Sequence, residues 1–194
     1  ILYDKEEGTT LHDNGLHECI ANDLNAVKAI DLAIVAEPTD NAIQLGCVGS
    51  LHSTLTVMGK AAHSARPWHG VNALYQALPI IHKASKQQPI AHSMFGVTFH
   101  DVIHITESES SKGRTTIPDT WTANINYRFS PTHTLNDAKA YVTDFVKTSG
   151  LENYQLNHLN GVDAGSVIEH PILNQIIESN QYTIEAKQAW TDVS

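Results

Sequence analysis

Residues 45–160 carry strand-like and helix-like hydrophobic patterns in the order β-α-β-β-α-β. The clearest pattern lies at residues 50–58, where Leu51, Leu55 and Val57 alternate with polar side chains. A period of two predicts a half-buried antiparallel strand. Further strands are predicted at 97–106, 121–129 and 153–159, and helices at 71–86 and 136–148. This order is that of a ferredoxin-like α+β sandwich.

The spacing of apolar residues predicts which face of each helix is buried. The first helix is expected to bury Leu74, Ala77, Leu78 and Ile81. The second is expected to bury Ala138, Tyr141, Val142 and Phe145.

The segments on either side of this region resemble parts of an α/β domain. Residues 14–30 have helical spacing, and residues 31–36 are a short apolar run typical of a strand buried on both faces. We therefore expect an α/β domain, formed by residues 1–44 and 161–194, that residues 45–160 interrupt. Because residue 1 is Ile and the last residues form no closing element, we expect the chain to be an internal piece of a longer protein.

Composition excludes several classes of function. With 12 Lys and Arg against 21 Asp and Glu, the formal net charge is −9. The chain has no basic run, so neither nucleic acid nor an anionic membrane is expected as a partner. No apolar stretch approaches the roughly 20 residues that span a bilayer, and two cysteines are too few for a disulfide framework. We expect a cytoplasmic protein, and its 12 histidines suggest metal or acid–base chemistry.

Carboxylates follow two predicted buried strands. Glu6 and Glu7 come after the apolar residues 1–3, and because neighbouring side chains of an extended segment point in opposite directions, one can bind a metal while the other faces a substrate water. Glu37 directly follows the run at 31–36 and is fixed by Pro38. Converging carboxylates suit Zn²⁺, Mn²⁺ or Co²⁺. Taken singly, each is also compatible with a solvated acidic loop or an ordinary turn.

Two basic side chains are further candidates. His63 follows the alternating strand in a loop of small residues, where nothing apolar buries its ring, so it can face a ligand or simply solvent. Arg128 lies between Tyr127 and Phe129 in a predicted strand, and therefore faces away from both, toward solvent or an anionic ligand.

The order of these motifs resembles a known family. In sequence they read EEG at 6–8, EPT at 37–39, GKAAHSARP at 59–67, IPD at 117–119 and NYRFSP at 126–131. Together they resemble the metal-dependent aminoacylase and carboxypeptidase family with a two-zinc site, and within it the succinyl-diaminopimelate desuccinylases. The resemblance implies a catalytic α/β zinc domain interrupted by a lid domain that forms a homodimer.

The resemblance also implies residue roles. Glu6 matches the general base that activates the attacking water, and Glu7 and Glu37 each match a ligand of one of two zinc ions. His63 matches a lid histidine that stabilises the oxyanion, usually from the partner subunit, and Arg128 matches a lid arginine that binds the substrate carboxylate.

Two threonines complete the set of expected site residues. Thr115 lies in the lid motif before Ile-Pro, although this chain lacks the asparagine often found there. Thr191 lies in a segment that resembles the entrance to a substrate-binding loop. Some desuccinylases have arginines where this chain has Cys47 and Val48, so the sequence does not establish recognition of a succinyl group.

The function implied is hydrolysis of an N-acyl amino acid, foremost N-succinyl-diaminopimelate to succinate and diaminopimelate, in the synthesis of lysine and cell-wall precursors. Zn²⁺ is the expected metal, with Co²⁺ or Mn²⁺ as substitutes. The family's first metal histidine, bridging aspartate and last metal histidine have no match in this chain, so we expect the chain alone to be inactive. An acetylornithine deacetylase, a dipeptidase of the same fold and a non-catalytic dimerising homologue remain alternatives.

Overall fold

The computed structural model describes residues 20–35, 38–94, 96–165, 170–179 and 181–191. The chain forms two compact units, one of residues 1–40 and 169–181, the other of residues 41–168 and 182–194. In the first unit the described residues include two helices, α2 (Leu24–Lys28) and α6 (Pro171–Glu178).

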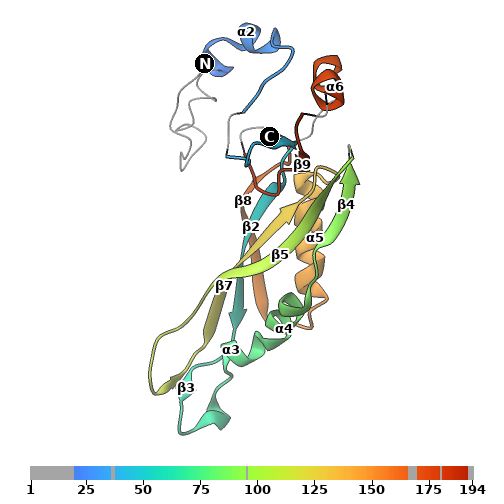
Figure 1. Cartoon of the computed structure of the whole chain (residues 1–194). Helices are drawn as coiled ribbons and strands as arrows, with labels where there is room; N and C mark the ends of the chain where they lie inside the picture. Colours follow the sequence, from blue (N-terminus) through green and yellow to red (C-terminus); the bar gives the residue numbers. More distant parts are fainter. Residues whose placement is uncertain (1–19, 36–37, 95, 166–169, 180, 192–194) are drawn as a thin grey trace. The chain divides into compact units, whose positions relative to one another are not determined.

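The second unit is built on a five-stranded antiparallel sheet in the order β4-β5-β7-β2-β8 (Figure 1). The strands are β2 (Gly49–Met58), β4 (Ile90–Met94), β5 (Val97–Ser110), β7 (Thr120–Phe129) and β8 (Tyr154–Val162). Four of them confirm the strands predicted from the sequence. The fifth, β4, was not predicted and adds an edge strand beside β5.

Helices α3 (Ala73–Gln76), α4 (Leu78–Lys86) and α5 (Leu135–Lys147) pack on one face of this sheet. As predicted, β2 alternates, with Leu51, Leu55 and Val57 buried against the helices. These side chains share one hydrophobic core with residues of β5, β7 and all three helices. Polar side chains occupy the opposite face of β2 and β7, where burial is intermediate.

Helix α5 follows its sequence pattern closely. Ala138, Val142 and Phe145 are buried as predicted, and Tyr141 packs against the same core. The helix begins with a capping box, in which the hydroxyl of Thr134 accepts a hydrogen bond from the backbone N–H of Asp137 and the Asp137 carboxylate accepts one from the backbone N–H of Thr134. Hydrogen bonds from Thr134 lower the pKa of that carboxyl.

The prediction of a single helix at 71–86 is wrong in one respect. This region forms two helices, which meet at Ala77. Pro79 lies in the first turn of α4, a position that needs no backbone N–H, whereas in the middle of a continuous helix it would break a hydrogen bond. The start of a second helix changes which side chains are buried. Ala77 and Ile80 are fully buried, while Leu74 and Leu78 are 37% and 54% exposed.

The strand predicted at 31–36 is also wrong over the described residues. Residues 31–35 form no strand, and Ile34 is 81% exposed. A strand buried on both faces needs neighbouring strands and covering helices. The described residues of the first unit contain no strand that could pair with it.

Two small sheets and a 3-10 turn complete the second unit. Strand β1 (Ile43–Leu45) pairs in parallel with β9 (Ile184–Ala186). Strand β3 (Ala62–His63) pairs antiparallel with β6 (Thr116–Ile117), and the 3-10 turn η2 (Pro67–His69) follows β3. Each helix in the described part of the chain is too short or too polar to cross a lipid bilayer.

Candidate functional site

His63 lies in the segment 59–71, which includes β3 and is called the His63 loop below. It leaves the sheet where β2 ends and β7 begins (Figure 1). The backbone N–H of Gly59 donates to Asp119 at 2.7 Å, and Lys60 exchanges two backbone hydrogen bonds with Val71. Gly59 is required by this close approach, because a Cβ atom there would lie 2.2 Å from the carbonyl oxygen of Val71.

The His63 ring is exposed and oriented by its own loop. Its Nδ1 accepts a hydrogen bond from the backbone N–H of Ala65 at 3.1 Å. In the neutral ring the proton therefore sits on Nε2, which can donate to a bound ligand. A polarising or oxyanion-stabilising role requires such a donor.

Thr115, another residue that the resemblance places in the lid part of the site, lies close to His63. The backbone carbonyl of Thr115 accepts from the N–H of Ser64 at 2.8 Å, and the β3–β6 pairing sets His63 opposite Thr116. A shallow pocket adjoins the loop and is lined by uncharged residues, among them Ser64, Asn72, Tyr75 and Thr116.

Arg128 lies half-buried near the other end of β7, opposite Ser50. Its Nε donates to the Asn126 side chain at 3.2 Å, and partial burial lowers the pKa of its guanidinium. Among the described residues, the ion pairs do not include Arg128. A fixed guanidinium without an internal carboxylate partner can bind an anionic ligand.

His63 and Arg128 lie at opposite ends of the sheet. The His63 loop adjoins Thr120, the first residue of β7, and Arg128 comes eight residues later (128 − 120) on the same strand. At roughly 3.4 Å per residue these ends are about 27 Å apart. One small amino-acid substrate therefore cannot contact both side chains of the same chain.

The structure describes one more of the expected residues. Thr191 is 4% exposed, and its backbone carbonyl accepts a weak hydrogen bond from the Cys47 thiol at 3.7 Å. Cys47 precedes β2, so Thr191 lies toward the Arg128 end of the unit. Glu6, Glu7 and Glu37 lie outside the described residues.

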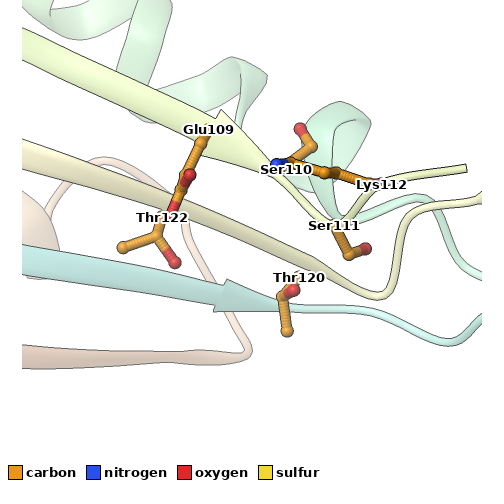
Figure 2. Close-up of a pocket in the computed structure, with 6 residues that line it drawn as sticks. All are labelled: Glu109, Ser110, Ser111, Lys112, Thr120 and Thr122. Atoms are coloured by element: carbon orange, nitrogen blue, oxygen red, sulfur yellow. The ribbon is translucent and has the colours of Figure 1, made fainter.

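A second shallow hollow lies between the end of β5 and the start of β7 (Figure 2). It is lined by Glu109, Ser110, Ser111, Lys112, Thr120 and Thr122. One of its hydroxyls is already used, since Ser111 accepts from the backbone N–H of Asp119 at 3.1 Å. Its lining is mostly exposed, and we assign no chemistry to it.

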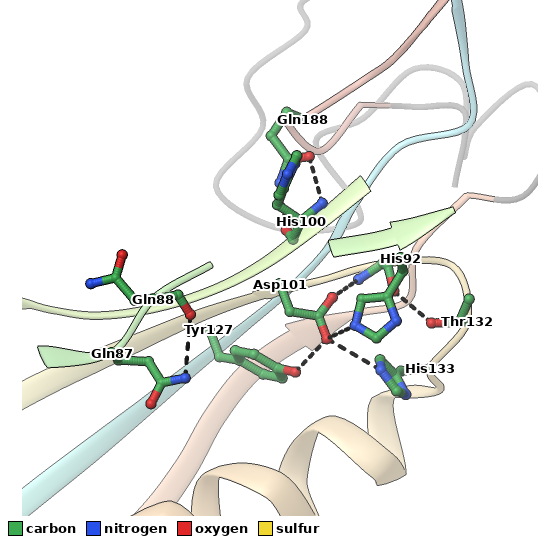
Figure 3. Close-up of polar contacts among 10 residues, drawn as sticks. Gln87, Gln88, His92, His100, Asp101, Tyr127, Thr132, His133 and Gln188 are labelled. Carbon is green, nitrogen blue, oxygen red and sulfur yellow. Dashed lines mark hydrogen bonds and ion pairs between the residues drawn. The ribbon is translucent and has the colours of Figure 1, made fainter. Parts of the chain in front are cut away.

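Figure 3 shows a buried polar cluster around Asp101 that the sequence did not predict. Asp101 is 3% exposed and lies 3.1 Å from Nε2 of His92 and 3.2 Å from Nε2 of His133. Tyr127 donates to its carboxylate at 2.9 Å, and the backbone N–H of Ser130 at 2.6 Å. The two histidines come from β4 and from the turn before α5, so no short sequence spacing joins them to Asp101.

Comparisons with known proteins agree with this architecture. Residues 45–153 match the profile of the peptidase dimerisation domain. The chain belongs to this peptidase family. The match confirms the resemblance seen in the motifs, and the predicted α+β lid or dimerisation fold is confirmed by the five-stranded sheet and its helices.

Curated relatives extend the similarity to the whole chain. The succinyl-diaminopimelate desuccinylase of Corynebacterium glutamicum is 34% identical over an alignment that covers 100% of this chain and 53% of that protein. A putative succinyl-diaminopimelate desuccinylase of Mycobacterium tuberculosis is 30% identical, with 100% and 54% covered. The chain thus spans about half the length of the curated relatives it matches.

A solved structure shows the same fold at lower sequence similarity. A tripeptidase from Staphylococcus aureus superposes with a TM-score of 0.62 at 15% identity, covering 89% of this chain and 47% of the tripeptidase.

Proposed function

We propose that the whole protein is a metal-dependent amidohydrolase that cleaves N-succinyl-diaminopimelate to succinate and diaminopimelate in the cytoplasm. The observation that carries the proposal is the similarity of the entire chain to two relatives named as actual or putative desuccinylases. We assign residues 45–160 to the lid, and residues 1–44 and 161–194 to the catalytic domain.

Three carboxylates of the first segment would supply the hydrolytic centre. Glu7 and Glu37 would each bind one of two zinc ions, and carboxylate oxygens are ordinary zinc ligands. Bound zinc lowers the pKa of water toward 7. Glu6 would accept the proton of the attacking water and return it to the leaving amine.

The lid would supply the groups that hold the substrate. The Nε2–H of His63 would donate to the oxyanion that develops at the amide carbonyl, with Thr115 beside it. Arg128 would bind a substrate carboxylate, and Thr191 would line the approach to it. Since His63 and Arg128 lie at opposite ends of one sheet, we propose a homodimer in which His63 and Thr115 complete the partner's site.

A direct assay tests the reaction. The full-length protein, purified with zinc, should hydrolyse N-succinyl-diaminopimelate faster than N-acetylornithine or a dipeptide. Preference for N-acetylornithine would favour a deacetylase, preference for the dipeptide a dipeptidase, and hydrolysis of none of them a non-catalytic homologue. Each of these results would overturn the proposed substrate.

Subunit mixing tests the shared site. Full-length Glu6→Ala and His63→Ala proteins should each be inactive, and a mixture should regain activity because a mixed dimer holds one site with both groups. At equal amounts about half of the dimers are mixed and half of their sites are intact, so about a quarter of the wild-type activity is expected. Verified subunit exchange without recovery would show that His63 does not act in the partner's site.

A further inference from the structure

His92, Asp101 and His133 bring three metal-binding atoms together inside the lid (Figure 3). The two imidazole Nε2 atoms and one oxygen of Asp101 all lie within 4.8 Å of one another. They come from edge strand β4, its neighbour β5 and the turn before α5, so three separate elements converge on one point.

The distances suit a tetrahedral ion. Ligands that bind zinc at about 2.0–2.1 Å in tetrahedral geometry are separated by about 3.3 Å. The Asp101 oxygen lies 3.1 Å from Nε2 of His92 and 3.2 Å from Nε2 of His133. An ion can therefore enter between these atoms with only small side-chain movement.

The carboxylate is held in place by two hydrogen bonds, one of them to the oxygen that also faces both histidines. Tyr127 donates to one oxygen of Asp101 at 2.9 Å and the backbone N–H of Ser130 donates to the other at 2.6 Å. At neutral pH the phenol of Tyr127 keeps its proton, so it serves as a hydrogen-bond donor to this carboxylate. Supporting hydrogen bonds of this kind orient the carboxylate ligands of metal sites.

One of the two histidines, His92, lacks a hydrogen bond that a purely structural cluster would give it. Nε2 of His92 is buried, yet it makes no hydrogen bond of acceptable geometry with the described residues, although the Asp101 oxygen lies close by. Its ring and that of His133 meet edge to face, with centroids 5.0 Å apart. A cation at the shared point would satisfy the Nε2 atoms of both rings at once.

We propose that His92, Asp101 and His133 bind one zinc ion, with water in the fourth position. Two imidazoles and a carboxylate favour zinc over magnesium or calcium, which prefer oxygen ligands. The side chains of His92 and His133 are 23% and 35% exposed, which leaves an entry path from solvent. The ion fastens edge strand β4 to the turn before α5, and it is separate from the ions assigned to Glu7 and Glu37.

Calorimetric titration of Zn²⁺ into the metal-free full chain tests this site. The Glu7→Gln, Glu37→Gln double variant provides the background, because it removes the two zinc ligands proposed elsewhere in this chain. We expect one zinc ion per chain, binding at least about tenfold more weakly in His92→Gln and in His133→Gln. His104→Gln, which replaces an exposed histidine of β5, is the matched control and should bind like its parent.

A second measurement uses the same double-variant background and needs no histidine substitution. Histidine-selective ¹⁵N spectra of the same chain should show two ring Nε2 signals shifting on addition of one equivalent of Zn²⁺, with no equivalent shift for Mg²⁺. Equal zinc affinity in His92→Gln, His133→Gln and the background, or no zinc binding at millimolar concentration, would overturn the site. Because Glu7 and Glu37 are replaced throughout, neither result depends on the proposed amidohydrolase function.

Discussion

At one end of the five-stranded sheet, Asp101 is 3% exposed, and four neighbouring groups of the same chain surround its carboxylate. At the other end, the His63 ring is exposed and receives one hydrogen bond, from its own loop. Both ends carry groups of polar side chains. At the first end, Asp101 is held by other groups of the chain, whereas at the second the His63 ring faces solvent.

This difference separates stability from activity. Removing a buried charged group leaves its former partners without hydrogen bonds and costs several kcal/mol, while removing an exposed side chain usually changes stability little. Under the proposed shared site, His63 must keep its donor exposed until the dimer forms. We therefore expect substitutions around Asp101 to lower stability and substitutions at His63 to lower activity.

The largest effect is expected at Asp101. In Asp101→Ala the Tyr127 hydroxyl and the backbone N–H of Ser130 lose their buried acceptor, which should lower the free energy of unfolding by about 3–5 kcal/mol. Denaturant unfolding followed by circular dichroism measures this. Glu107→Ala, at an exposed position of the same strand, should stay within about 0.5 kcal/mol of wild type. Equal stability of the two variants would contradict the role of the buried cluster.

His63→Ala should show the opposite behaviour. In the full-length protein, loss of the oxyanion donor should lower kcat for N-succinyl-diaminopimelate by about 10²–10³. The free energy of unfolding should change by less than about 0.5 kcal/mol, because the ring is exposed. If the variant lost stability and activity together, the loop would be a folding element and the contrast between the two ends would fail.

Gly59→Ala tests how the His63 loop is attached to the sheet. A Cβ atom would lie 2.2 Å from the Val71 carbonyl oxygen and 2.9 Å from the Ala73 backbone nitrogen, neither of which can rotate away. The resulting shift should cost about 1–3 kcal/mol. Amide chemical shifts should change around residues 59–73 and remain unchanged near Asp101. Changes that reached Asp101 would show that the two ends are coupled.

The sequence predicted those parts of this architecture that local patterns encode. Alternation identified β2, and helical spacing identified α5 with its buried face. Strand β4 was missed because its residues are mostly exposed and show no apolar alternation, as is common at a sheet edge. The break at Ala77 was missed because the apolar spacing was followed through Pro79, which only a new helix start accommodates.

For the candidate site, too, some features were predicted from the sequence and others were not. Motif order singled out His63, Thr115 and Arg128 as candidates. Their positions at two ends of the sheet follow from the pairing register of β2 with β7, which depends on contacts between distant segments. The cluster around Asp101 carried no motif, and a high histidine count was the only signal of it. The roles assigned to the expected site residues all stay predictions, those of Glu6, Glu7, Glu37, His63, Thr115, Arg128 and Thr191.

The smallest effect is expected at His158, a partly buried residue of β8 whose ring bridges β2 and α5. Its Nδ1 lies 2.8 Å from the Ser53 hydroxyl and its Nε2 lies 3.1 Å from the Thr143 hydroxyl. Because Thr143 already donates to the Lys139 carbonyl at 2.7 Å, it accepts from Nε2–H, and Ser53 donates to Nδ1. A proton added to Nδ1 would reverse this bond and leave the hydroxyl proton of the fully buried Ser53 without that acceptor.

Burial of the ring, and then the charge of Lys139, lower the pKa of His158. The unfolded chain, with an ordinary histidine pKa of about 6.5, therefore binds a proton at a higher pH than the folded chain does. The contribution of His158 to stability is present above about pH 6.5 and is lost as the pH falls toward the folded pKa. In His158→Gln this loss should disappear, so unfolding free energies measured between pH 7 and 5 should fall less steeply than in wild type. His104→Gln serves as the control and should keep the wild-type slope. An identical slope in wild type and His158→Gln would mean that the ring is protonated equally in both states, and that the Ser53–His158–Thr143 bridge does not depend on the neutral form.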